Sequence, residues 1–121
     1  MSLSNEDLYK VRLSVRKVLE KHLSPNVDYL EQKGEFSKEA FRALGEMGFV
    51  APMLPEPYGI NCLMTQMMVA IEMGRVCNGF GLSALASVDL FGANVSWWGS
   101  DEQKEKYLPG IASGEKIGCW G

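Results

Sequence analysis

The sequence has 121 residues, 46% of them hydrophobic and 22% charged, and its formal net charge of −3 is ordinary for one soluble globular domain. The acidic balance argues against a nucleic-acid-binding domain, because such domains usually carry a basic patch. No stretch approaches the ~20 apolar residues of a membrane span, and the charged first segment lacks the apolar region of a secretory signal. We therefore expect a cytoplasmic protein that binds neither nucleic acid nor membrane.

A helical pattern opens the chain. Ser4 is followed three residues later by an acid, as in a capping box, and apolar residues then recur every three or four positions as far as Leu23. Ser24 and Pro25 predict that the helix restarts, with Ser24 as the cap and Pro25 in the first turn, where no N–H is needed. Gly34 is expected to end this second piece.

A shorter helix is predicted from Ser37 to Gly48. Ser37 is a good N-cap, and Phe36 and Phe41 occupy the two positions of a hydrophobic staple around it. Gly48 stands just after the helix, where a left-handed conformation is common. Residues 49–58 contain three prolines and are expected to form an irregular connection.

A methionine-rich helix is expected over residues 62–76. Asn61 stands just before it and is a plausible N-cap, because its side chain can accept from the first free N–H groups. The Asn-Gly pair at residues 78–79 is expected to break this helix. Glu72 and Arg75 lie three residues apart on one face, which predicts a structural ion pair.

Two further helices are predicted. The first, over residues 80–98, is largely apolar, and so little polarity indicates burial on most sides. The run from Ser100 to Gln103 is a clear capping box. It begins a last helix, which is expected to end near residues 108–110, at a Pro-Gly pair.

About six helices with short connections predict an all-α fold, an up-and-down helical bundle that occupies residues 1–115. Beyond it, residues 116–121 have the pattern of a β-strand that is just beginning. A single strand has no hydrogen-bonding partner and is not stable in water by itself. We therefore expect this C-terminal segment to start a β-domain that the chain lacks.

Little in the sequence indicates catalysis. The single histidine, His22, stands at a helix end, where a surface or capping role is simpler than a catalytic one. Asp89 is an acid in an apolar helix and should be paired or lie at a wet boundary, which is simpler than a role as general base. The cysteines form no CxxC pair and no zinc pattern, so we expect reduced, buried thiols rather than a disulfide or a metal site. They are Cys62, Cys77 and Cys119.

One side of the helix over residues 80–98 carries small residues. The positions on that side are Leu82, Ser83, Ala86, Ser87 and Leu90. A stripe of small residues leaves room beside the backbone. Spacing alone favours a second helix packed closely against it, and the alternative is one wall of an apolar ligand slot.

Several stretches of the chain resemble the opening domain of the acyl-CoA dehydrogenases. They read EAF at residues 39–41, LGEMGF at 44–49, PEPYG at 55–59, IEMGR at 71–75, WGSDEQKEKYLP at 98–109 and ASGEKIGCWG at 112–121. The resemblance runs through nearly the whole chain in order, and the last two stretches are its most specific part. Ile60 departs from it, because the family commonly has a second glycine there.

The resemblance implies a function for the parent protein. Enzymes of this family oxidise an acyl-CoA thioester: a glutamate far downstream removes the α-proton, and the β-hydrogen leaves as hydride to FAD. The chain is similar to the acyl-pocket domain of such an enzyme, without its catalytic residue. The 121-residue chain alone is therefore expected to be inactive and to hold no FAD, and residues 116–121 would start the flavin-binding β-domain.

The resemblance also implies site residues. The family's acyl-pocket positions fall on the small-residue side described above, so the resemblance favours the ligand slot over plain packing. Those substrate-binding positions are Leu82, Ser83, Ala86, Ser87 and Leu90. Trp120 falls where the family places an aromatic residue near the flavin.

The implied partners are an acyl-CoA substrate, an acceptor similar to electron-transfer flavoprotein and further copies of the parent, which should be a homo-oligomer. In a eukaryote the mitochondrial matrix would replace the cytoplasm. Two alternatives stay open: a stand-alone helical interaction or acyl-binding module, and a dehydrogenase-like protein that acts on a carrier-protein thioester.

Overall fold

The computed structural model describes residues 3–121, and in this part of the chain every regular element is helical. The α-helices are α1 (Asn5–His22), α2 (Val27–Lys33), α3 (Lys38–Glu46), α4 (Leu63–Val76), α5 (Asn78–Leu85), α6 (Ala93–Trp98) and α7 (Asp101–Ser113). A short 3₁₀ turn, η1 (Ser24–Asn26), precedes α2, and a π-helix, η2 (Ala86–Gly92), joins α5 to α6. The predicted all-α fold is confirmed.

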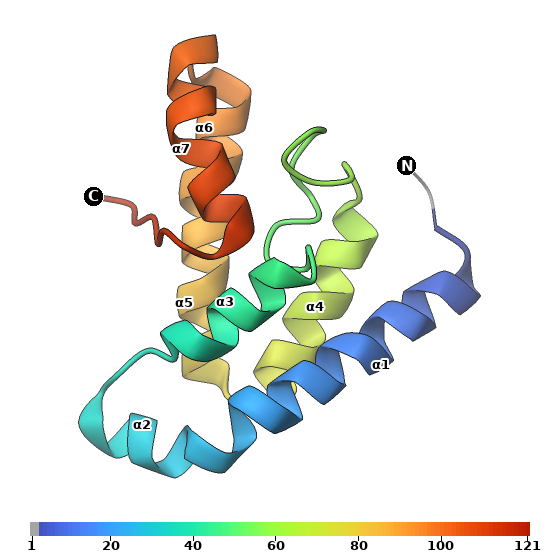
Figure 1. Ribbon diagram of the computed structural model, residues 1–121, viewed down its shortest axis with the longest axis vertical. Coiled ribbons are helices and arrows are strands. Elements are labelled where there is room, and N and C mark those ends of the chain that lie inside the picture. The colour runs from blue at the N-terminus through green and yellow to red at the C-terminus, as the bar shows by residue number, and fades with distance from the viewer. Residues whose placement is uncertain (1–2) are drawn as a thin grey trace.

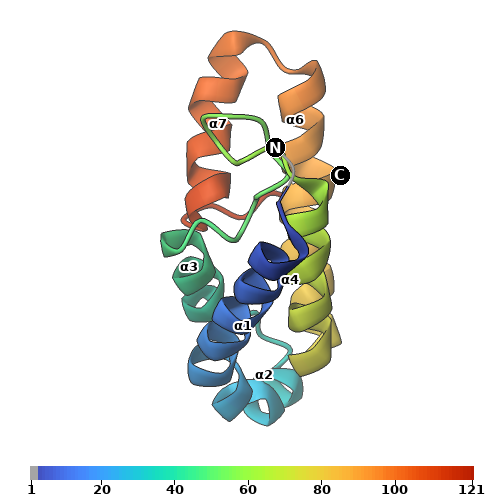
Figure 2. The same cartoon turned by 90° about the vertical axis from the view of Figure 1, so that its right-hand side faces the viewer.

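The helices form an elongated bundle (Figure 1). The elements α5, η2 and α6 form one continuous rod, and α7 folds back beside its upper end. Helix α4 packs against both α1 and α5, and α3 packs against α1 and α7. Figure 2 shows α6 and α7 at one end of the molecule and α2 at the other. Among the described residues, no helix is long and apolar enough to cross a bilayer.

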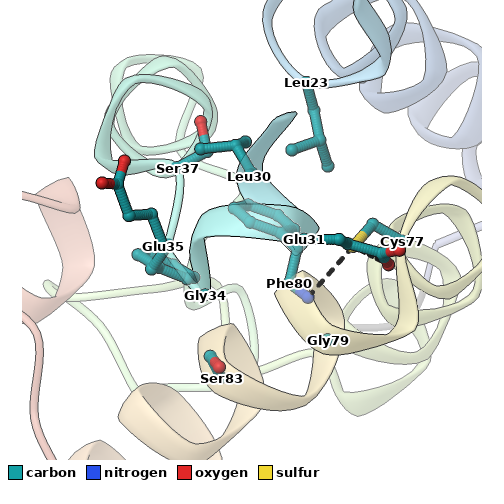
Figure 3. Close-up of a pocket in the computed structure, with 11 residues that line it drawn as sticks. Leu23, Leu30, Glu31, Gly34, Glu35, Ser37, Cys77, Gly79, Phe80 and Ser83 are labelled. Atoms are coloured by element: carbon teal, nitrogen blue, oxygen red, sulfur yellow. Dashed lines mark hydrogen bonds between the residues drawn. The ribbon is translucent and has the colours of Figure 1, made fainter. Parts of the chain in front are cut away.

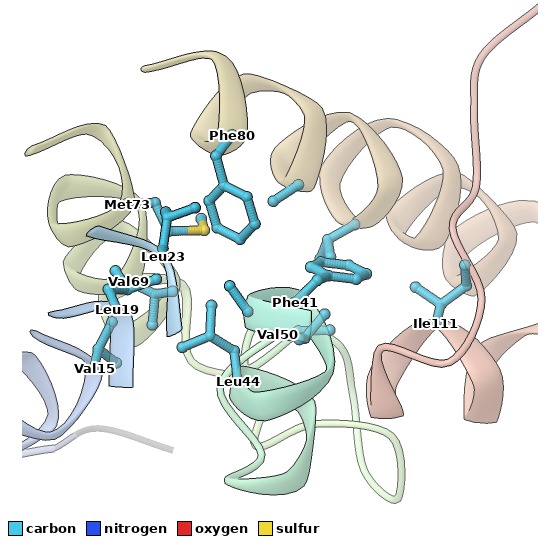
Figure 4. Packing of buried hydrophobic residues seen from close by; sticks show 14 of the residues in the cluster. Val15, Leu19, Leu23, Phe41, Leu44, Val50, Val69, Met73, Phe80 and Ile111 are labelled. Carbon is cyan, nitrogen blue, oxygen red and sulfur yellow. The ribbon is translucent and has the colours of Figure 1, made fainter. Parts of the chain in front are cut away.

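The core lies where α1, α3, α4 and the rod meet (Figure 4). Leu19 of α1, Phe41 and Leu44 of α3 and Val69 of α4 are almost completely buried. Burial of this much apolar surface stabilises the bundle, at roughly 1.5–3 kcal/mol for each large side chain. The core therefore joins segments from both halves of the chain into one unit.

The predicted N-caps of α1 and α3 are confirmed. The Ser4 hydroxyl accepts the N–H of Asp7 at 3.1 Å, and the Ser37 hydroxyl accepts the N–H of Ala40 at 3.1 Å. The rings of Phe36 and Phe41 meet edge to face with their centroids 5.5 Å apart, as the staple predicts. The capping box of α7 is present as well.

Glycines end three of the helices. Gly34, Gly48 and Gly114 all have positive φ, between 66° and 77°, which glycine adopts without a Cβ penalty. Gly45 has a different role, because a Cβ there would collide with the backbone carbonyl of Ser113. The close crossing of α3 and α7 therefore requires glycine at residue 45.

Two predicted caps are wrong. Ser24 makes no capping bond, because it lies inside η1, whose N-cap is Leu23. Asn61 has a left-handed backbone, with φ 51°, and the N-cap of α4 is Cys62 instead. An N-cap needs an extended backbone so that its side chain can reach the following N–H groups, and neither residue has one.

Two predicted helix boundaries are also wrong. The break after α4 falls at Cys77, and the Asn-Gly pair at residues 78–79 begins α5 rather than interrupting the chain. Helix α7 continues through Pro109 to Ser113. Pro109 is tolerated because it and Glu105, whose carbonyl loses its helical partner, both lie on the exposed side, where water can hydrate that carbonyl.

The apolar composition of the rod had predicted burial on most sides, and this prediction is wrong. Leu82, Leu90, Trp97 and Trp98 are all exposed large hydrophobic residues. A second exposed stripe lies on α4 and consists of Leu63, Met64, Met67 and Ile71. The bundle therefore buries one side of α4 and of the rod and leaves an apolar side of each open to solvent.

Candidate functional site

The π-helix η2 occupies the middle of the rod, at Ala86–Gly92. A π-helix has a wider turn than an α-helix and is often found at functional sites. The wider turn shifts the residues that follow Leu85 around the rod axis relative to those of α5. The predicted acyl-pocket residues lie partly on α5 and partly in this π-helix.

The structure separates the five predicted pocket residues. Leu82 is 74% exposed and Leu90 is 49% exposed, Ser83 is exposed and Ala86 is half-buried. Ser87 differs, because it is 0% exposed and points into the protein. Four of the five positions therefore open to the surface of the rod, and the fifth does not.

Leu90, which was predicted to contact the acyl chain, and Trp120, which was predicted to lie near the flavin, line one groove. Its volume is about 510 Å³, and its walls come from η2, α6, α7 and the C-terminal segment. The lining residues are Leu90, Phe91, Asn94, Val95, Trp98, Gly99, Gln103, Tyr107 and Trp120. Apolar and aromatic side chains with a few amides are the usual lining of a small-molecule site. Apart from Trp120, the sequence had not indicated the aromatic residues of this groove, since Phe91, Trp98 and Tyr107 come from three separate elements.

Ser83 lines a different cavity, of about 260 Å³, between α2, the start of α3 and α5 (Figure 3). Phe36 and Phe80 stack there with their ring centroids 5.0 Å apart. The Cys77 thiol donates to Glu31 at 3.6 Å and accepts the N–H of Phe80 at 3.5 Å. Cys77 is therefore the N-cap of α5, a role that a thiol fills seldom enough for the sequence not to predict it.

The C-terminal segment lies against η2 and α7. The N–H of Gly118 donates to the Ser87 hydroxyl at 2.9 Å, and the N–H of Lys116 donates to the carbonyl of Gly110 at 3.0 Å. Residues 116–121 contain no strand. Their role as the start of a β-domain stays a prediction.

A charge cluster joins α1 to α4 away from this groove. The Glu72 carboxylate is 0% exposed and accepts hydrogen bonds from Arg12 and Arg16, both at 3.0 Å, and from Arg75 at 3.1 Å. The bond from Arg16, followed by those from Arg12 and Arg75, outweighs burial and lowers the pKa of Glu72 to about 2. The predicted Glu72–Arg75 pair is confirmed, but sequence spacing could not reveal the two arginines of α1.

Asp89 of η2 is the least satisfied acid. Burial raises the pKa of its carboxyl, and its Oδ1 atom is buried without a hydrogen-bond partner among the described residues. The sequence had predicted either a partner or a wet boundary for Asp89, and this part of the chain supplies no partner for its Oδ1 atom. His22, in contrast, pairs with Glu39 at 2.8 Å at the end of α1, which supports the surface interpretation.

The three cysteines are free, as expected, but only Cys62 is buried, whereas Cys77 is half-buried and Cys119 is exposed. No group of three His, Cys, Asp or Glu side chains that could hold a metal ion occurs within residues 3–121. The groove itself is lined by apolar and aromatic side chains together with the amides of Asn94 and Gln103.

The chain is similar to known proteins of one family. The family model for the N-terminal domain of acyl-CoA dehydrogenases matches residues 5–115. The chain belongs to the acyl-CoA dehydrogenase family. A probable acyl-CoA dehydrogenase, YngJ, of Bacillus subtilis is 32% identical over 113 residues, covering 92% of this chain and 30% of the relative. The mitochondrial isovaleryl-CoA dehydrogenase of Bos taurus is 36% identical over 119 residues, covering 95% and 28%.

Solved structures agree with this family. An acyl-CoA dehydrogenase of Bacillus anthracis complexed with FAD superposes with a TM-score of 0.83 at 30% identity, over 96% of this chain and 20% of the other. A glutaryl-CoA dehydrogenase of Mycobacterium smegmatis superposes with a TM-score of 0.83 at 27% identity, over 95% and 30%. This acyl-CoA dehydrogenase domain therefore spans less than a third of the length of these relatives.

Proposed function

We propose that the chain is the acyl-pocket domain of a flavin-dependent acyl-CoA dehydrogenase, whose parent protein oxidises an acyl-CoA thioester between its α and β carbons. The observation that carries the proposal is the open apolar side of the rod in a chain that matches this family's N-terminal domain. Leu82, Ala86 and Leu90 follow one another at four-residue steps there, with the small Ala86 between two leucines. A flat acyl chain would fit over the alanine.

The residues of the chain would bind the substrate and exclude water from it, and they would not transfer a proton. Leu82, Ser83, Ala86 and Leu90 would line one side of the acyl chain, and an apolar wall excludes water from the reacting carbons. Holding those carbons in one orientation removes much of the entropic barrier to reaction. Bound FAD would accept the hydride.

Trp120 is the residue present here that fits a flavin. Its indole is 68% exposed and lines the same groove as Leu90, so one face of the ring is free to contact a planar group. The sequence contains no glycine-rich phosphate loop, and the chain therefore supplies only one edge of the cofactor site. The chain by itself is expected to bind no FAD.

We propose three partners for the parent protein: an acyl-CoA substrate, an acceptor of the electron-transfer flavoprotein kind and further copies of the enzyme. One matching chain comes from a structure described as the electron transferring flavoprotein of Acidaminococcus fermentans, with a TM-score of 0.83 at 27% identity over 97% of this chain. A mitochondrial location, as in the isovaleryl-CoA relative, would apply to a eukaryotic parent.

Anaerobic mixing of the protein encoded by the whole gene with acyl-CoA thioesters tests this proposal. We expect a flavin absorption band that bleaches when a suitable acyl-CoA is added. Replacing Ala86 with leucine should lower kcat/KM for long acyl chains by about tenfold or more and leave short ones nearly unchanged, because the leucine would occupy the acyl space. Such a loss corresponds to about 1.4 kcal/mol.

Two results would support the alternatives instead. Bleaching by an acyl-carrier-protein thioester, but not by the CoA thioester, would favour a carrier-dependent enzyme. Tight binding of acyl-CoA to the 121-residue chain in calorimetry, with no flavin in the whole protein, would favour a stand-alone acyl-binding module. A control variant, Ala112→Leu, adds the same bulk to a half-buried alanine of a different helix, α7, that is not among the predicted acyl-pocket positions.

A further inference from the structure

Ser87 is a buried polar residue with one long-range hydrogen bond. Its side chain is 0% exposed, and its hydroxyl accepts the N–H of Gly118 at 2.9 Å across 31 residues of sequence. Ser87 lies in the first turn of the π-helix, so this bond attaches the C-terminal segment to the middle of the rod. A buried hydroxyl so committed is unavailable to an acyl chain.

The C-terminal segment is held by shape as well as by this bond. A Cβ at residue 118 would collide with the ring of Phe91, so only glycine allows the backbone to reach the Ser87 hydroxyl. Phe91 is itself fixed by Tyr107, with the two ring centroids 6.0 Å apart and nearly perpendicular. Upstream, the bond from the N–H of Lys116 to the carbonyl of Gly110 ties the segment to α7.

This attachment determines what lies in the groove. Trp120 stands two residues beyond Gly118, and Leu90 stands three residues beyond Ser87 in the same helical rod. Both side chains line the groove of about 510 Å³. The bond from Gly118 to Ser87 is therefore a short connection between the two walls that carry Leu90 and Trp120.

We propose that Ser87 is a positioning residue, which anchors the C-terminal segment through the Gly118 N–H and so sets the position of Trp120 relative to Leu90. This assignment takes Ser87 out of the acyl-contact set implied by the family resemblance. The importance of the position rests on the proposed function, in which Leu90 faces the acyl chain and Trp120 faces the flavin. The anchoring itself needs neither ligand.

Amide hydrogen exchange on the 121-residue chain tests the anchor. In Ser87→Ala, we expect the Gly118 amide to exchange about fivefold faster, since a net hydrogen bond contributes about 1 kcal/mol. The indole N–H resonance of Trp120, assigned with a Trp120→Phe variant, should shift in the same protein. Ser87→Thr keeps the hydroxyl and should restore Gly118 protection. Ser83→Ala, a change on the exposed side of the same rod, should alter neither signal.

Two outcomes would overturn the proposal. Unchanged Gly118 exchange in a folded Ser87→Ala chain would show that the hydroxyl does not hold the segment. Faster exchange throughout α5, η2 and α6 together with a lowered Tm would show that Ser87 serves packing only. Because neither outcome depends on flavin or acyl-CoA, failure here leaves the dehydrogenase proposal intact, and failure of the flavin-bleaching assay leaves the anchor intact.

Discussion

Two regions of the molecule differ in how their side chains are buried and paired: the contact between α1 and α4, and the open side of the α5–η2–α6 rod. At the first, apolar side chains are buried, and one buried carboxylate receives hydrogen bonds from three arginines. On the second, large apolar side chains face solvent. The same rod contains Asp89, whose Oδ1 atom is buried with no partner in the part of the chain that the structure describes.

This difference distinguishes folding from function within one small domain. The α1–α4 contact is complete by itself, and we expect changes there to alter stability. The open side of the rod holds surface that the bundle does not need, and contiguous exposed apolar surface is typical of an interaction or binding site. Changes there should alter association and ligand binding with little effect on the fold.

The largest expected effect is at the charge cluster. Glu72→Ala removes the carboxylate from between Arg12, Arg16 and Arg75. This leaves the guanidinium groups of Arg12 and Arg16 without this partner, and Arg75 with only its exposed pair to Glu20. Breaking a buried ion pair from one side typically costs at least about 3 kcal/mol, and we expect a loss of that order in urea unfolding with an unchanged m-value. The control is Glu20→Ala, whose exposed pair with Arg75 at 3.4 Å should contribute less than about 1 kcal/mol. Equal losses in the two variants would contradict a special role for Glu72.

The same cluster predicts the acid stability of the chain. The pKa of Glu72 is lowered in the folded state from 4.5 to about 2, so the folded state binds its proton less readily than the unfolded state. Its stabilisation, on the order of 3 kcal/mol, is therefore fully present above about pH 5 and is lost as the pH falls toward 2. Unfolding of the wild type and of Glu72→Gln, measured between pH 7 and pH 2, should converge at the acid end. A constant difference between them across this range would exclude the linkage.

A smaller effect of opposite sign is expected at Asp89. Burial raises the pKa of its carboxyl, so the folded state disfavours the charged form, and at neutral pH the charge destabilises the fold. Because Asp89 is only half-buried, solvent screens part of this cost, and Asp89→Asn should raise the free energy of unfolding at pH 7 by less than about 1 kcal/mol. The gain should shrink as the pH falls and the wild-type carboxyl becomes protonated. A lower free energy of unfolding for the Asp89→Asn variant at pH 7 would mean that the carboxylate has a stabilising partner.

The smallest effect on stability is expected at the exposed stripes. Met67→Lys on α4 and Leu82→Lys on the rod change side chains that are at least half exposed, and each should shift the free energy of unfolding by no more than about 0.5 kcal/mol. Both should reduce self-association in sedimentation velocity, because they place charge in an apolar surface. Lys10→Met on α1 replaces an exposed charge with an apolar side chain and serves as the reverse control. If neither lysine variant changed self-association, these stripes would not be the surface through which the chain self-associates.

Local signals predicted much of the fold, because the forces behind them act within a few residues. Ser4 and Ser37 cap helices, and Gly34 and Gly48 end them, for reasons contained in the adjacent backbone. The prediction for the end of α7 was wrong at Pro109 because the prolyl ring faces water, where the lost backbone bond is replaced. Whether a residue faces water or the core of the folded protein is not visible in a local sequence pattern.

The site was less predictable for a different reason. The family resemblance named Leu90 and Trp120, but their shared groove depends on the path of the C-terminal segment, which the sequence alone does not fix. Ser87 points inward, whereas the small-residue stripe had placed it on the same side of the helix as Ala86. Similarly, the arginines of α1 reach Glu72 across about 60 residues of sequence, and no spacing rule connects positions that far apart.

We propose that the rest of an acyl-CoA dehydrogenase covers the open side of the rod, whereas the α1–α4 contact is complete within this chain. Amide hydrogen exchange compares the 121-residue chain with the protein encoded by the whole gene most directly. We predict that residues of η2, α6 and the C-terminal segment gain at least about tenfold protection in the longer protein, while α1 and α4 amides in their mutual contact stay the same. Equal protection of the rod in both proteins would contradict the account.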